Sequence, residues 1–96
     1  MGNYIINSER IMKFEKQLSK SETKYKYVGL PKNIREENFP EKDELFDVKF
    51  ESKTYKMKVN NKGCIMLTQL YDAHAFEEGE TLKIKSSKKG FEFSVQ

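Results

Sequence analysis

The chain has 96 residues, of which 36% are hydrophobic and 34% charged, with a formal net charge of +3 at pH 7. This length suits one domain, and we expect a single domain over residues 1–96 with its core between about residues 10 and 95. No apolar run approaches the roughly 18 residues of a membrane-spanning helix, and a single cysteine excludes a disulfide framework and a cysteine-rich zinc site.

The first third of the chain combines an ambiguous segment, a basic segment and a short helix. Residues 11–18 (IMKFEKQL) fit a strand or a helix, and their alternation slightly favours a strand. Residues 19–27 (SKSETKYKY) are polar, basic and aromatic without a core period, so we predict a loop of about ten residues, a length more often functional than neutral. Residues 32–39 (KNIREENF) predict one or two helical turns that end before Pro40.

From residue 46 onward, apolar residues mostly recur at every second position. Bulky and charged residues alternate over 46–51 and again over 55–59, which predicts a hairpin with its turn at Ser52 and Lys53. Residues 60–63 (NNKG) predict a tight turn, and 64–67 (CIML) a fully buried strand.

The last third predicts a short helix and a second hairpin. Thr68 can cap a helix over 69–76 (QLYDAHAF), in which Leu70, Ala73 and Phe76 fall three apart. Apolar and polar residues alternate over 81–85 and again over 91–95, which predicts two strands joined by a turn at 86–90. Several short strands with two short helices predict a small, mostly β barrel or sandwich.

Charge is unevenly distributed along the chain. Residues 13–35 carry seven basic and two acidic side chains, residues 36–55 three basic and seven acidic, and residues 56–96 seven basic and five acidic. Two basic segments separated by an acidic one can build a molecule with one positive face, which suits a polyanion. An ordinary solvated surface explains the same charges equally well.

The order of these segments resembles a known family. FEKQLSKSETKYKYVGLPKNIREENFP is similar to the opening of plant B-three DNA-binding domains, FDVKFESKTYKMKV to their central hairpin, and LTQLYDAHAFEEGETLKI to a later segment with Glu80 in place of the usual aspartate. The EcoRII-type restriction endonucleases carry a related N-terminal effector domain. The tryptophan common in the plant domains is absent, and Tyr71 lies nearby, so a bacterial or phage protein is favoured.

The resemblance implies a fold and a binding mode. The fold is mainly β (α+β), a small open β-pseudobarrel of about seven short strands with two short helices, from the DNA-binding pseudobarrel superfamily. Two loops of this family grip the major groove of double-stranded DNA. They correspond here to a first arm, residues 19–27, and a second arm, residues 58–64. A bacterial cytoplasmic or nucleoid-associated location would follow.

The arms offer side chains suited to DNA. Lysines and hydroxyls suit phosphates, asparagine can pair with adenine, and Glu22 could accept from the amino group of cytosine. No arginine, the best guanine reader, lies in either arm. The candidate DNA-binding residues are Ser19, Lys20, Ser21, Glu22, Thr23, Lys24, Tyr25, Lys26, Lys32, Arg35, Lys58, Asn60, Asn61 and Lys62. The same lysines can be solvated loop charges, and the asparagines turn residues.

Catalysis by this chain is not expected. The single histidine, His74, lies at helical spacing among apolar residues, and Cys64 lies in an apolar strand without an orienting third residue. We predict sequence-specific binding of duplex DNA without cofactor, metal or membrane, as a restriction-enzyme specificity domain beside a separate catalytic domain or as a stand-alone protein. The alternatives are a protein-interaction module, such as a phage inhibitor, and a binder of single strands.

Overall fold

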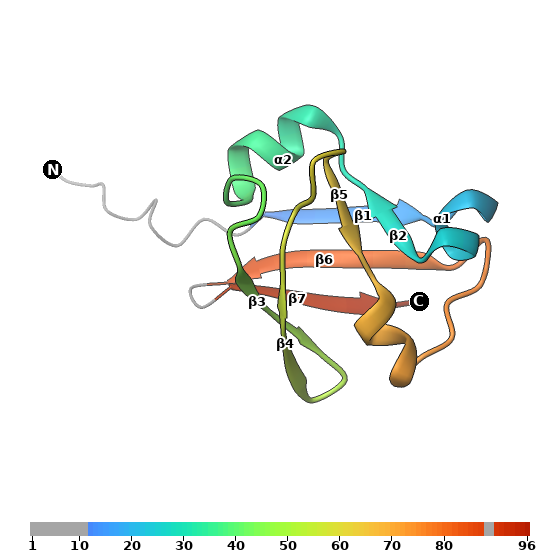
Figure 1. Ribbon diagram of the computed structural model, residues 1–96. Coiled ribbons are helices and arrows are strands. Elements are labelled where there is room, and N and C mark those ends of the chain that lie inside the picture. The colour runs from blue at the N-terminus through green and yellow to red at the C-terminus, as the bar shows by residue number, and fades with distance from the viewer. Residues whose placement is uncertain (1–11, 88–89) are drawn as a thin grey trace, which may run out of the picture.

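The computed structural model describes residues 12–87 and 90–96, which form a five-stranded sheet and a two-stranded ribbon (Figure 1). The sheet has the order β1-β6-β7-β3-β4 and the ribbon pairs β2 with β5. The strands are β1 (Lys13–Gln17), β2 (Tyr27–Gly29), β3 (Phe46–Phe50), β4 (Lys53–Met57), β5 (Cys64–Met66), β6 (Thr81–Ser87) and β7 (Gly90–Val95). The helices are α1 (Lys20–Tyr25), α2 (Lys32–Asn38) and the 3₁₀ helix η2 (Thr68–Asp72).

The sheet and the ribbon curve around one core to give an open barrel. All pairings are antiparallel except that of β3 with β7. A bridge between Val59 and Ile65 joins the end of the β3–β4 hairpin to the ribbon. A side chain of β1 also contacts β2, since Lys16 Nζ donates to the Gly29 carbonyl oxygen.

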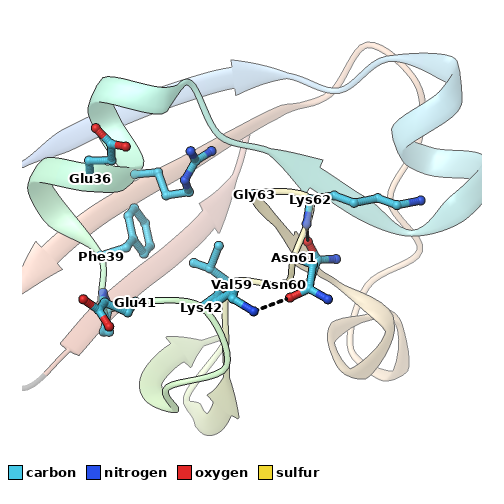
Figure 2. A pocket seen from close by; sticks show the side chains of 11 residues that line it. Glu36, Phe39, Glu41, Lys42, Val59, Asn60, Asn61, Lys62 and Gly63 are labelled. Atoms are coloured by element: carbon cyan, nitrogen blue, oxygen red, sulfur yellow. Dashed lines mark hydrogen bonds between the residues drawn. The ribbon is translucent and has the colours of Figure 1, made fainter.

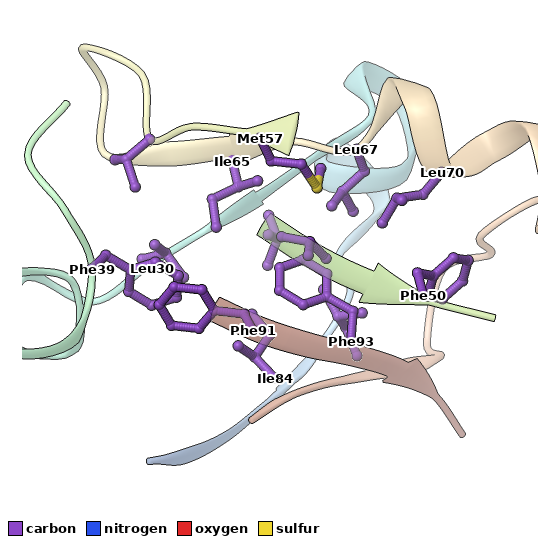
Figure 3. Close-up of a cluster of buried hydrophobic side chains, with 14 of the residues drawn as sticks. Leu30, Phe39, Phe50, Met57, Ile65, Leu67, Leu70, Ile84, Phe91 and Phe93 are labelled. Atoms are coloured by element: carbon purple, nitrogen blue, oxygen red, sulfur yellow. The ribbon is translucent and has the colours of Figure 1, made fainter. Parts of the chain in front are cut away.

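Aromatic and aliphatic side chains from every layer fill the core (Figure 3). Phe39 stacks on Phe91 with ring centroids 4.3 Å apart, and Phe46 packs edge-on against both rings. Phe50 and Phe76 stack at the end of the core towards η2. Because α2 and the ribbon are anchored by this core, the two predicted arms are attached to a rigid frame.

Both hairpins and α2 are confirmed as elements, but some bounds differ: the first hairpin turns at Glu51 and Ser52, β4 is Lys53–Met57 rather than 55–59, and β6 continues to Ser87. The loop predicted over residues 19–27 is wrong. That segment contains α1, a six-residue helix capped by Ser19. Its polarity reflects an exposed helix with one buried residue, Glu22, so an apolar helical period is absent from the sequence.

Two predictions for residues 64–76 also need correction. The helix expected over 69–76 is a 3₁₀ helix without a side-chain cap from Thr68, and Ala73 is exposed. Of the three apolar positions that predicted the helix, only Leu70 lies within η2, whereas Ala73 and Phe76 follow it in the chain. The strand 64–67 is buried on one face only: Ile65 and Leu67 are buried, whereas Met66 is 45% exposed. A two-stranded ribbon covers the core with a single face.

Candidate nucleic-acid interface

The first arm is a capped helix that presents basic side chains. The Ser19 hydroxyl accepts from the Glu22 amide, and the Thr23 hydroxyl donates to the carbonyl oxygens of Ser19 and Lys20. Lys20, Ser21 and Lys24 are exposed. α1 ends at Tyr25, and the left-handed backbone of Lys26, the C-cap residue, turns the chain into β2.

Glu22 is not an exposed base-reading group, which corrects the sequence prediction. Its side chain is 3% exposed, and both carboxylate oxygens are engaged. Oε1 accepts from the Ser19 amide at 2.9 Å, while Oε2 accepts from the Gly29 amide at 2.8 Å and pairs with Lys16 Nζ at 2.9 Å. Burial alone would raise the pKa of Glu22, but these hydrogen bonds and the Lys16 charge hold it below its usual value. Glu22 therefore fastens α1 to β1 and β2.

The second arm is a tight turn shaped by Asn60. Its side-chain oxygen accepts from the amides of Lys62 and Cys64, and its backbone amide donates to the Cys64 carbonyl oxygen. The turn closes at Gly63, which has a φ of +75°. Asn60 thus acts as a turn residue, and the tip of the arm is formed by Asn61 and Lys62, both exposed.

The other second-arm candidates have ionic or polar neighbours. The Asn61 side-chain oxygen accepts from Lys42 Nζ at 3.0 Å. Lys58, which is about half exposed, pairs with Asp43 at 3.5 Å. Because an exposed ion pair contributes little stability, Lys58 is only weakly held by that partner.

The two arms line one groove, although 30 residues or more separate their sequences. Its volume is about 710 Å³, and its floor is the outer face of the β2–β5 ribbon. The lining residues come from α1, β2, the turn and β5: Ser21, Tyr25, Tyr27, Asn60, Asn61, Lys62, Cys64 and Met66. We call this the arm groove.

A second hollow, the α2 cleft, lies between α2 and the other side of the turn (Figure 2). Its volume is about 480 Å³, and Lys42, Asn61 and Lys62 contribute to its wall. The half-buried Arg35 also lines it, with its guanidinium against Gly63. Lys32 is exposed at the first position of α2 and does not line either hollow.

Most cations around the arms carry uncompensated charge. Within residues 12–87 and 90–96, the following make no ion pair: Lys20, Lys24, Lys26, Lys32, Arg35 and Lys62. Lys24 Nζ lies 5.4 Å from the Tyr25 ring centroid and Lys26 Nζ 5.1 Å from that of Tyr71. These contacts leave the ammonium groups charged and able to bind an anion.

Sequence reasoning missed the apolar part of the arm groove. Met66 and Cys64 were expected to be buried in a strand without an open face. The available signal was the alternation of Cys64 and Met66 with Ile65 and Leu67, since alternation indicates a strand with one open face.

His74, the only histidine of the chain, is hydrogen-bonded to a neighbouring carboxylate. His74 Nε2 lies 3.1 Å from each carboxylate oxygen of Glu80, and the Glu77 amide donates to the same carboxylate. Among the residues that the structure describes, no cluster of three His, Cys, Asp or Glu side chains could hold a metal ion. No helix in that part of the chain is long and apolar enough to cross a membrane.

Comparison with known proteins identifies the fold. No protein-family model matches the sequence, and no curated protein matches it. The structure is similar to the N-terminal domain of Helicobacter pylori LlaJI.R1, with a TM-score of 0.72 and 10% identity over 88% of this chain and 86% of that one. The chain has the pseudobarrel fold. The fold predicted from the sequence resemblance is thereby confirmed.

Two plant structures with this pseudobarrel fold are complexes with DNA. The Arabidopsis FUS3-DNA complex matches with a TM-score of 0.67 and 16% identity, covering 91% of this chain and 97% of that one. The complex of the Arabidopsis thaliana transcription factor LEC2 with DNA matches with a TM-score of 0.63 and 19% identity, covering 91% and 95%.

Proposed function

We propose that this protein binds double-stranded DNA sequence-specifically, with both arms in the major groove. The observation that carries the proposal is the arm groove itself, which residues of both arms line and whose two walls carry the exposed lysines Lys20, Lys24 and Lys62. The DNA complexes of two proteins with the same fold support it. We further propose that any cleavage belongs to a separate domain or subunit, as in a restriction endonuclease, and that a stand-alone bacterial or phage protein is the other setting.

Different residues of the arms supply affinity and specificity. Lys20, Lys24 and Lys62 bind phosphates, which supplies most of the affinity and makes it salt-dependent. Asn61 contacts a base edge: Lys42 occupies one lone pair of its side-chain oxygen, and the second lone pair and the Nδ2 protons remain for adenine N6 and N7.

Replacement of matched lysines tests the phosphate role. We expect Lys24→Ala to weaken binding to all duplexes. The decrease of log affinity with log salt should become less steep, by about 1 in the slope. Lys53→Ala, which removes the same charge at the distant β3–β4 turn (Figure 1), leaves affinity and slope unchanged. Equal losses in both variants would show that only net charge matters and would contradict the proposal.

The Asn61 role is tested on specific and random DNA. Asn61→Ala removes one base contact, so we expect a loss of about 1–3 kcal/mol on the preferred duplex and little loss on random duplexes. Equal losses on both would exclude a base-reading role.

The exposed side chains of Tyr25 and Met66 favour one alternative, a protein-interaction surface. Such a module would show no salt-dependent retention of duplex DNA and would tolerate the Lys24 change. Preference for single strands, with Tyr25 stacking on bases, would instead support single-strand binding.

A further inference from the structure

The floor of the arm groove is apolar, which phosphate contacts do not require. In the β2–β5 ribbon, Tyr27 lies directly opposite Met66 and Gly29 opposite Cys64. The neighbouring pair, Val28 and Ile65, faces the core and is fully buried. Since side chains of a directly opposed pair share a face, Tyr27, Cys64 and Met66 form one apolar strip on the open face.

Polar groups of both arms surround this strip. Asn61 and Lys62 lie on the turn at one side, and Ser21 on α1 at the other. Met66 is 45% exposed, so its side chain can contact a ligand held between the arms. The ligand that fits is therefore anionic or polar at its margins and carries an apolar group at its centre.

We propose that the strip contacts the C5 methyl group of a thymine, with Met66 as the main contact and Tyr27 beside it. The inference rests on the proposed function. In the major groove of unmodified DNA, the thymine methyl is the apolar group presented at base edges. Phosphate oxygens and the other base edges are polar and gain nothing from a thioether.

The asparagines of the second arm favour the same base pair. The side-chain oxygen of Asn60 is already used twice within the turn, whereas Asn61 retains the donor and acceptor that adenine needs. An adenine contact beside a thymine-methyl contact predicts an A·T pair in the recognised sequence, and arginine, the best guanine reader, is absent from both arms.

The test compares thymine with deoxyuridine, which lacks only the methyl group. Each thymine of the preferred duplex, found by selection from a random pool, is replaced in turn by deoxyuridine, and affinities are measured for the unmodified protein and three variants. For the unmodified protein, we expect one replacement to weaken binding about fourfold, which corresponds to ~0.8 kcal/mol for one buried methyl group.

The variants assign that effect to the strip. Met66→Ala abolishes the difference between thymine and deoxyuridine, because the apolar partner is gone. Met66→Leu and Leu45→Ala retain it, since the first keeps an apolar side chain and the second removes an exposed leucine that does not line the groove. Met66 and Leu45 are both exposed, so neither change is expected to unfold the protein.

Three results would overturn the inference: a preferred sequence without thymine, equal affinity for thymine and deoxyuridine at every position, or full discrimination in Met66→Ala. Specific duplex binding with any of these results leaves the proposed function intact. Absence of specific duplex binding overturns both.

Discussion

Glu22 shows how one side chain can be misassigned when only its neighbours in sequence are considered. In a polar, basic segment it resembles an exposed acceptor, yet its carboxylate is buried and joins α1 to two strands. The signal present in the sequence is the spacing of Ser19 and Glu22, which matches a capping box. That pattern predicts both the helix and the inward role of the glutamate.

Stability should fall in acid because of Glu22. The pKa of Glu22 is lowered in the folded protein, so its contribution is present above the usual glutamate pKa and is lost as the pH falls through the folded-state pKa. We expect the free energy of unfolding to decrease as the pH falls below about 5. Glu22→Gln lowers it by about 1–3 kcal/mol at pH 7 and flattens the acid decline.

Urea unfolding at several pH values measures both effects. Glu78→Gln, at an exposed turn position, is the matched control and should leave the curve unchanged. An acid decline as steep in Glu22→Gln as in the unmodified protein would contradict this role.

Gly63 fixes the shape of the second arm through Arg35. Its φ of +75° favours glycine, and a Cβ there would collide with the Arg35 guanidinium. Gly79 has a φ of +93° but open space around it. We expect Gly79→Ala to cost about 1 kcal/mol from backbone strain alone and Gly63→Ala to cost more.

A double-variant cycle isolates the Arg35 contact. In an Arg35→Ala background, the unfolding cost of Gly63→Ala should fall to that of Gly79→Ala. If Gly63→Ala still costs more unfolding free energy than Gly79→Ala in the Arg35→Ala background, the guanidinium is not the cause of the extra cost.

Among the elements, the strands were more predictable than the helices. Period-two alternation identifies β3, β4, β6 and β7, because each buries one face against the core. α1 has a single buried residue and therefore lacks the apolar period by which helices are found. η2 was predicted as a helix, but it is a 3₁₀ helix that ends at Asp72. A capping box defines α1, and the buried Leu70 anchors η2 to the core.

The capping box of α1 should be needed for DNA binding as well as for stability. Ser19→Ala removes the cap and should cost about 1 kcal/mol of unfolding free energy. Because the cap orders the helix that carries Lys20, Ser21 and Lys24, DNA affinity should fall too. Ser19→Thr keeps the hydroxyl and should restore both quantities in urea unfolding and DNA titration. Loss of affinity in Ser19→Thr would indicate a direct contact by Ser19 instead.

At the scale of the whole molecule, the pseudobarrel was predictable from the order of its segments, while the surfaces required coordinates. The sequence places the two arms at 19–27 and 58–64 but does not reveal that both line one groove, because that depends on the β2–β5 pairing. It likewise cannot show that Arg35 contacts Gly63 across the α2 cleft. Long-range pairing therefore determines which of the candidate residues can act together.

The central claim is sequence-specific recognition of duplex DNA, and selection of bound duplexes from a random-sequence pool tests it most directly. The selection is followed by titration of the selected duplex from about 50 to about 300 mM salt. We predict a short enriched motif, bound far more tightly than random duplex, with affinity that falls steeply as salt rises. No enrichment, together with no salt-dependent retention of duplex, would contradict the account.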